Sequence, residues 1–172
     1  QNYEEAARWY SKAAVQGDAN AQYHLGVMYA NGRGVRQNYE EAAQWYRKAA
    51  EQGDEDAQNN LGALYDEGQG VRQDSAEAVR WYRKAAERGY VVAQNNLGVA
   101  YSEGQGVRQD YPEALRWYRK AAEQGFAAAQ HNLGEMYYEG KGVHQNYTEA
   151  LQWYLKAAEG GFSPAQNRLG EM

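Results

Sequence analysis

The chain contains no cysteine among its 172 residues, which excludes disulfide bonds and thiolate chemistry. No apolar run reaches the length of about 18 residues that a membrane-spanning helix needs, so the sequence predicts no membrane insertion. The 18 Lys and Arg are outnumbered by 23 Asp and Glu, and the net charge of −5 provides no general attraction for nucleic acid or anionic membranes. These absences leave the compartment undetermined.

The chain is organised by a repeat with a period of 36 residues. Five tryptophans, each followed by a tyrosine, mark the period: Trp9, Trp45, Trp81, Trp117 and Trp153. A leucine-glycine pair keeps the same step at Leu25-Gly26, Leu61-Gly62, Leu97-Gly98, Leu133-Gly134 and Leu169-Gly170. A fixed period of about 20 to 50 residues is typical of a solenoid, in which each unit buries its apolar face against its neighbours.

Each period predicts two helices. The segment from Asn38 to Glu51 starts with an N-cap residue, and Glu41 follows it at the spacing of a capping box. The same pair recurs as Asp74 with Glu77, Asp110 with Glu113 and Asn146 with Glu149. Glycines that follow these helices are expected to end them in the left-handed conformation: Gly53, Gly89, Gly125 and Gly161.

The other helix of each period runs from about Ala57 to Glu67 and carries Gly62 in its interior. A glycine inside a helix costs about 1 kcal/mol relative to alanine, so its recurrence indicates that a Cβ there would hold a neighbouring helix away. The helix closes with Gly-x-Gly-Val, a turn whose valine we expect to cover the helix pair. This turn is no phosphate loop, because no strand precedes it and the third glycine is missing.

The sequence therefore predicts an all-α fold, a solenoid of 36-residue two-helix repeats in a single array over residues 1–172. The predicted units are a partial repeat at 1–18, full repeats at 19–54, 55–90, 91–126 and 127–162, and a partial repeat at 163–172. We call the helix with the leucine-glycine pair the first helix of a repeat, and the helix with the Trp-Tyr pair the second. Because both ends fall within a repeat, we expect a fragment whose end faces support end-to-end homo-association.

The repeat pattern A-Q-x-N-L-G-x-x-Y-x-x-G-x-G-V-x-x-D-x-x-E-A-x-x-W-Y-x-K-A-A-E-x-G resembles the Sel1-like repeat, a relative of the tetratricopeptide repeat. The resemblance covers nearly the whole chain. It implies a right-handed α/α superhelix whose first helices line a concave groove. It also implies a bacterial adaptor that assembles protein complexes, in envelope or host-contact settings. Some members carry a cysteine pair in each repeat, and this chain has none.

Catalysis is the first alternative, because some disulfide-rich relatives have been linked to β-lactam hydrolysis. None of the four serines begins a Ser-x-x-Lys motif, and the three histidines fall at unrelated repeat positions. His131 and Glu135 have a spacing that suits two metal ligands on one helix face, but the rest of a metal site is missing. We therefore predict no enzyme, no catalytic residue, no metal and no cofactor.

Other surfaces have structural explanations beside functional ones. RNA-binding helical repeats need a basic groove, and the first helices here are mostly acidic, so nucleic acid is not expected as a partner. The Trp-Tyr pairs are expected to pack between repeats rather than to bind sugars. One basic residue beside each Gly-Val turn forms a row: Arg36, Arg72, Arg108 and His144. The row can be interpreted as keeping these loops soluble or as a ridge that binds an acidic partner, and both interpretations stay open.

The candidate partner-binding residues are those that differ from repeat to repeat, while the leucines, glycines, tryptophans and tyrosines that mark the period stay the same. They lie in pairs just before each first-helix leucine, and we call them the paired positions: Tyr23-His24, Asn59-Asn60, Asn95-Asn96, His131-Asn132 and Asn167-Arg168. Glu135 is added to this set. By the resemblance, the second member of each pair points into the groove and hydrogen-bonds a bound peptide. The other interpretation is that asparagine braces the neighbouring repeat, and both stay open.

The predicted function is a protein-protein interaction scaffold that binds a peptide or protein segment in the concave groove. An acidic rim of the first helices would steer a basic or amino-terminal segment toward the carboxamides. The alternatives are a hydrolase of the β-lactam type and a module that self-assembles through its repeat ends.

Overall fold

The computed structural model describes residues 2–172, and Gln1, the first residue of the predicted partial repeat 1–18, lies outside the described residues. The described chain consists of helices joined by short turns, with no strand, which confirms the all-α prediction. None of these helices has the length and apolar character that crossing a lipid bilayer requires.

The helices alternate between the two predicted types. The second helices of the repeats are α1 (Tyr3–Val15), α3 (Tyr39–Glu51), α5 (Ser75–Glu87), α7 (Tyr111–Glu123) and α9 (Tyr147–Glu159). The first helices are α2 (Ala19–Asn31), α4 (Glu55–Glu67), α6 (Val91–Glu103), α8 (Ala127–Glu139) and α10 (Ser163–Glu171).

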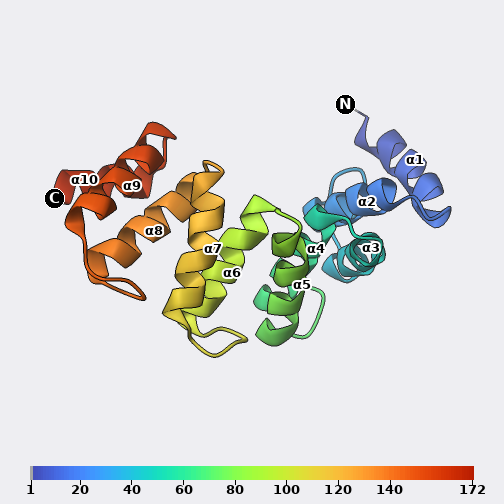
Figure 1. Ribbon diagram of the computed structural model, residues 1–172. Coiled ribbons are helices and arrows are strands. Elements are labelled where there is room, and N and C mark those ends of the chain that lie inside the picture. Colours follow the sequence, from blue (N-terminus) through green and yellow to red (C-terminus); the bar gives the residue numbers. More distant parts are fainter. Residues whose placement is uncertain (1) are drawn as a thin grey trace. The chain divides into compact units, whose positions relative to one another are not determined.

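The described chain divides into two compact units at the bond between Arg88 and Gly89. Unit 1 contains α1 to α5 and unit 2 contains α6 to α10. Within each unit every helix packs against the next one in the chain, from blue to green in unit 1 and from yellow-green to red in unit 2 (Figure 1). Packing between nearest neighbours is the arrangement that a repeat array requires.

The second helices begin at the predicted caps. The Asn38 side chain accepts hydrogen bonds from the backbone N–H groups of Glu40 and Glu41. Asp74, Asp110 and Asn146 cap their helices in the same way. Each cap pairs a donor that the helix itself leaves unpaired. After α3, Gly53 has a φ of 96°, the left-handed conformation predicted for it.

The second half of the predicted capping box is not formed. In that motif the glutamate accepts a hydrogen bond from the backbone N–H of the cap residue. Here the N–H of Asn38 donates to the carbonyl oxygen of Tyr29 at 2.9 Å, which ties the start of α3 to α2. The glutamates are therefore available to other partners: Glu113 accepts from the guanidinium of Arg116 and from the indole of Trp117.

The glycines inside α2, α4, α6 and α8 each lie against a tyrosine of the following second helix. A Cβ built on Gly62 would lie 2.7 Å from Cε1 of Tyr82, and one on Gly98 would lie 2.6 Å from Cδ1 of Tyr118. Gly26 meets Tyr46, and Gly134 meets Tyr154, in the same manner. Carbon atoms this close would overlap, so glycine allows the two helices their observed separation. The predicted packing role of this glycine is confirmed.

The Gly-x-Gly-Val turns need their two glycines for different reasons. Gly68 ends α4 with a φ of 68°. Gly70 has a φ of 67°, and a Cβ on it would overlap the backbone carbonyl group of Tyr39. The turn therefore rests directly on the backbone at the start of α3. Val71 packs against the core of unit 1, as predicted.

Two rows of glutamines brace the two turns of each repeat. The buried Gln58 donates from its side-chain amide to the carbonyl oxygen of Ala50 at 3.0 Å, which joins α4 to the end of α3. Gln73 donates to the carbonyl oxygen of Asp66 at 2.7 Å and closes the end of α4. Gln22, Gln130 and Gln166 match the first bond, and Gln37, Gln109 and Gln145 match the second. Backbone carbonyls thus explain why glutamine recurs.

The aromatic pairs pack as expected in the middle of the chain. Trp81 and Trp117 are buried, and the tyrosines that follow them are buried with them. Trp45 and Trp153 are half-buried. Trp9 differs, because 62% of its surface is exposed.

Candidate partner-binding face

The paired positions lie between two anchors on the first helices. In α4 the buried Gln58 precedes Asn59-Asn60 and the buried Leu61 follows them. Gln58 is tied to a backbone carbonyl and Leu61 lies in the core, so the pair between them has a fixed direction. The order glutamine, pair, leucine is the same in the other first helices.

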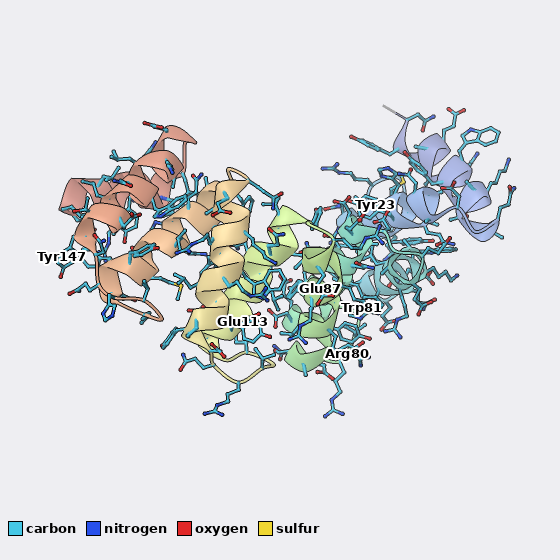
Figure 2. The ribbon with its side chains drawn as sticks, in the orientation of Figure 1. Tyr23, Arg80, Trp81, Glu87, Glu113 and Tyr147 are labelled. Carbon is cyan, nitrogen blue, oxygen red and sulfur yellow. The ribbon has the colours of Figure 1, made fainter. Side chains whose placement is uncertain are left out.

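In unit 1 the paired residues of α2 are aromatic and half-buried. The ring centroids of Tyr23 and His24 lie 5.1 Å apart, and that of His24 lies 5.0 Å from Tyr10 of α1. Tyr23, labelled in Figure 2, also lies 6.0 Å from the ring centroid of Tyr46 on α3. Four rings from three helices therefore form one continuous aromatic row. The sequence did not assign Tyr10 and Tyr46 to this face, although the two tyrosines occupy the same position of the 36-residue repeat.

Asn60 of α4 meets this aromatic row. Its carboxamide lies near Tyr23 and Tyr46 and lowers the pKa of both hydroxyls. Burial is the larger effect at Tyr46 and raises its pKa to about 12. Burial, and then the negative charges of Asp56 and Asp54, raise the pKa of Tyr23. The row thus lies close to two carboxylates at the start of α4.

Asn59 and Asn95 are placed differently from the accessible groove residues that the sequence predicts. Their exposed fractions are 7% and 9%, so both side chains are buried. The second members of these pairs, Asn60 and Asn96, are half-buried. The exposed polar surface of α4 and α6 is therefore narrower than predicted, with one partly accessible paired residue on each helix.

In unit 2 the paired positions of α6 and α8 are in direct contact. Asn132 donates from Nδ2 to Oδ1 of Asn95 at 3.1 Å. This bond is the bracing between repeats that the sequence left open beside peptide binding. A carboxamide has two donors and an acceptor, so Asn132, which is half-buried, has hydrogen-bonding capacity beyond this bond.

Glu135 is the centre of a polar cluster in unit 2. It accepts hydrogen bonds from the hydroxyl of Tyr154 at 2.8 Å and from Nη2 of Arg168 at 3.2 Å. The guanidinium carbon of Arg168 lies 4.5 Å from the ring centre of Tyr138. Burial is the main cause that raises the pKa of Tyr154. The cluster ties α10 to α8 and α9, and it holds a cation between a carboxylate and an aromatic ring.

His131 borders the same cluster. Its Nε2 lies 4.0 Å from a carboxylate oxygen of Glu135, and its ring lies 5.6 Å from Tyr154 and 5.5 Å from Phe162 between centroids. Burial lowers the pKa of His131, while Glu135 raises it and Arg168 lowers it. No group of three side chains suited to a metal ion occurs in the described part of the chain. Asn167, the remaining predicted residue, is exposed on α10.

The basic residues in the helices of unit 1 are confined to the second helices. The first helices α2 and α4 carry no lysine or arginine, and their acidic residues are Glu55, Asp56, Asp66 and Glu67. The basic residues of the second helices are Arg8, Lys12, Arg47, Lys48, Arg80, Arg83 and Lys84. The second helices also carry seven glutamates, which balance these basic residues. Among the helices of unit 1, the unbalanced negative charge therefore lies on α4, where its potential attracts cations.

The second helices carry a feature that the sequence reasoning missed. A lysine three residues after each tryptophan lies over its ring, with Nζ between 3.9 and 4.3 Å from the centroid. These lysines are Lys12, Lys48, Lys84, Lys120 and Lys156. The i, i+3 spacing is the signal that predicts such contacts. The basic row of Arg36, Arg72, Arg108 and His144 is exposed, and its binding role stays a prediction.

A Sel1 repeat family model matches residues 1–18, 19–54, 55–90, 91–126 and 127–162. The chain is similar to the crystal structure of c5321, a protective antigen of uropathogenic Escherichia coli with an SLR fold, at 46% identity and a TM-score of 0.94. That match covers 99% of this chain and 37% of the other. A Sel1 repeat protein from Oxalobacter formigenes matches at 43% identity and a TM-score of 0.90, over 95% of this chain and 65% of the other. The chain thus spans less than two thirds of either protein.

A more distant similarity links the chain to Helicobacter pylori cysteine rich protein B. The identity is 26% and the TM-score is 0.59, over 74% of this chain and 92% of that one. No protein in the curated set is similar enough to count as a match. All three solved structures come from bacteria.

Proposed function

Because the chain belongs to the Sel1 repeat family, whose members generally act as non-enzymatic scaffolds for protein interactions, we propose that it binds an extended segment of another protein on its first helices. The observation that carries this proposal is that residues which differ between repeats lie between buried residues which do not. Buried glutamine and leucine hold α4 and α6 in place, while Asn60 and Asn96 between them are partly accessible.

Carboxamide side chains suit such a partner. Each offers a donor and an acceptor, which match the N–H and C=O groups of an extended backbone without requiring one side-chain sequence. The proposed contact residues are Asn60 in unit 1 and Asn96 and Asn132 in unit 2, with Tyr23, His24, His131, Glu135, Asn167 and Arg168 as the variable residues around them. Asn59 and Asn95, being buried, would act by holding their neighbours.

Bracing between repeats and peptide binding are compatible roles for these residues. The bond from Asn132 to Asn95 orients Asn132 and leaves part of its carboxamide accessible. A residue oriented before binding loses less conformational entropy when the partner arrives. We therefore assign asparagine both roles in unit 2.

The test is a peptide-array screen with the wild type and with the triple variant Asn60→Ala/Asn96→Ala/Asn132→Ala. We expect binding to weaken by about tenfold or more, since loss of three hydrogen bonds of about 1 kcal/mol each is partly offset by solvent. A matched control is Gln44→Ala/Gln152→Ala, which removes exposed carboxamides from the second helices α3 and α9. Thermal melts check that all three proteins are folded.

Equal binding by the wild type and the triple variant would contradict the proposal that the first helices bind the partner. The exposed basic row at Arg36, Arg72 and Arg108 would then be the better candidate. Its charge-reversal variants can be screened on the same array.

Homo-association is a second candidate, supported by one observation. Trp9 of α1 is 62% exposed, whereas the other four tryptophans are buried or half-buried. Tyr3 is 43% exposed and its counterpart Tyr39 is half-buried, although Tyr147 at the same repeat position on α9 is 53% exposed. A second copy that supplied an equivalent helix would cover the same area.

A further inference from the structure

We propose that the aromatic row of unit 1 binds a cationic side chain, lysine or arginine, of the partner segment. Tyr23 and His24 would contact the cation, and Tyr10 and Tyr46 would hold these two rings in place. The inference rests on the proposed function and names the chemistry of one anchor within it.

The geometry of the row supports a cation subsite. Tyr23 and His24 are half-buried, so their rings are partly accessible, while Tyr46 is buried against Gly26. The centroid separations of 5.0 to 6.0 Å join Tyr10, His24, Tyr23 and Tyr46 without a gap. Aromatic faces attract cations through their quadrupole, at separations of up to about 6 Å from the ring centre.

Negative charge lies beside these rings. Asp54 and Asp56 at the start of α4 are close enough to raise the pKa of Tyr23, and Asp54 also interacts electrostatically with His24. Since α2 and α4 carry no lysine or arginine, the basic side chains nearby come from flanking segments: Arg33 borders the hollow described below, and Arg88 is paired with Glu55. A partner residue is the chemical complement of such a surface.

Unit 2 contains an example of the same chemistry within the chain. There Arg168 lies over the Tyr138 ring at 4.5 Å and is paired with Glu135. Arg168 occupies the paired position that corresponds to His24 in unit 1, since the two are separated by four periods of 36 residues. The face of the first helices therefore accepts a guanidinium between an aromatic ring and a carboxylate. Tyr138 and Glu135 belong to the first helix one repeat before Arg168, whereas the rings near His24 come from α1, α2 and α3, and Asp54 and Asp56 come from the start of α4. The two sites therefore share their chemistry but not their arrangement.

A hollow beside the row provides space for a side chain. It measures about 400 Å³ and is lined by Tyr10, His24 and Met28 on the side of the row. Arg33 borders it elsewhere, with its guanidinium carbon 6.0 Å from the ring centre of Tyr3. The apolar lining suits the methylene stem of a lysine, whose charged end would then meet the rings.

The experiment uses an array of short extended peptides with a single lysine, each paired with the same peptide containing norleucine. We expect the wild type to bind lysine peptides about tenfold more tightly than their norleucine partners, the range that a partly desolvated cation–π contact supports. In the variant Tyr23→Asn/His24→Asn, which copies the Asn59-Asn60 pair of the next repeat, this ratio should fall to about one. Tyr23→Phe/His24→Phe retains two rings and should keep the preference for lysine.

The two proposals fail in different ways. Equal affinities of the wild type for lysine and norleucine peptides would overturn the present inference, as would a lysine preference that survives in Tyr23→Asn/His24→Asn. Peptide binding that does not depend on Asn60, Asn96 and Asn132 would overturn the proposed function instead. An array on which the wild type binds no peptide would overturn both. Thermal melts of each variant exclude unfolding as the cause of a lost preference.

Discussion

At the scale of single residues, contacts between glycine and tyrosine set the distance between helices. Gly98 of α6 lies directly beneath the ring of Tyr118 on α7, and the same contact recurs in the other repeats. Tyr118 is buried, so its ring has little room to move away from an added side chain. The period of the two residues in the sequence was enough to predict a packing role for the glycine. The identity of the ring above it required the structure.

We expect Gly98→Leu to destabilise the protein by about 2 kcal/mol or more, because the leucine would overlap Tyr118 in a closely packed site. The measurement is the free energy of unfolding in urea. Gly170→Leu is the matched control, since a Cβ at Gly170 meets nothing within 4 Å and its effect should stay within about 0.5 kcal/mol. Equal stabilities of Gly98→Leu and the wild type would contradict the packing role.

The buried tyrosines predict a loss of stability at high pH. Burial raises the pKa of Tyr46 to about 12 from its ordinary value of 10.0, and it raises the pKa values of Tyr82, Tyr118 and Tyr154 as well. A raised pKa means that the folded state favours the neutral phenol, so its stabilising effect is complete below about pH 10. It is lost as the pH rises through the pKa of the folded state.

Unfolding should therefore accompany tyrosine ionisation between about pH 10 and 12, rather than follow it. Circular dichroism and absorbance at the tyrosinate band, recorded in one titration, provide the comparison. Tyr46→Phe has no ionisable hydroxyl and should shift the alkaline transition of unit 1 to higher pH. Tyrosinate absorbance that rises fully while the helical signal is unchanged would show that these hydroxyls are accessible.

At the scale of helices, the ends are specified by polar side chains in some elements and by packing in others. Second helices begin at Asn or Asp caps, whereas α6, α8 and α10 begin at Tyr90, Phe126 and Phe162 without a side-chain cap bond. The spacing of cap and glutamate predicted the start of each second helix correctly. It could not predict that the cap N–H would bond Tyr29 of the previous helix, because that contact depends on how two helices meet.

We expect Asp110→Ala to reduce the stability of the protein by about 1 kcal/mol, because the side chain accepts from the backbone N–H of Glu113 at 3.0 Å. Asp110→Asn is the matched variant and should retain most of the wild-type stability, since Asn38 and Asn146 cap their helices at the same repeat position. Thermal and urea unfolding measure both. A loss as large for asparagine as for alanine would show that the negative charge, rather than the cap bond, stabilises α7.

At the scale of the whole chain, the period predicted the helices and the location of the variable pairs. It did not predict which member of each pair is accessible. Asn59 and Asn60 are adjacent and chemically identical, yet one is buried and the other half-buried, because the neighbouring helix covers only one side. The polar cluster around Glu135 could not be predicted from the sequence either, because Arg168 reaches it from a different repeat.

The exposure of α1 predicts behaviour that depends on concentration. Its amides should exchange faster than those of α7 in dilute solution, because α2 is the neighbour against which it packs and Trp9 lies exposed. Association would cover α1 and slow its exchange as concentration rises. Hydrogen exchange and light scattering at two concentrations measure both effects. A monomer at both concentrations, with α1 as protected as α7, would contradict the prediction of homo-association.

The distribution of charge predicts how binding responds to salt. The chain has a net charge of −5, and in unit 1 the acidic residues of α4 have no basic residue on the same helix, whereas the glutamates of the second helices are matched by an equal number of lysines and arginines. A basic segment that binds the first helices should therefore associate more slowly as salt screens the attraction, by about tenfold between low and high ionic strength.

The association rate of a lysine peptide, measured by stopped-flow fluorescence, tests this prediction with two matched variants. Glu67→Gln/Glu103→Gln removes exposed carboxylates from α4 and α6 and should reduce both the rate and its dependence on salt. Glu87→Gln/Glu123→Gln removes exposed carboxylates from the ends of α5 and α7 and changes the net charge by the same amount. Because only the first pair shares helices with the paired positions, its effect should be the larger. Equal effects of the two variants would mean that the peptide responds to net charge alone and that the first helices do not guide it.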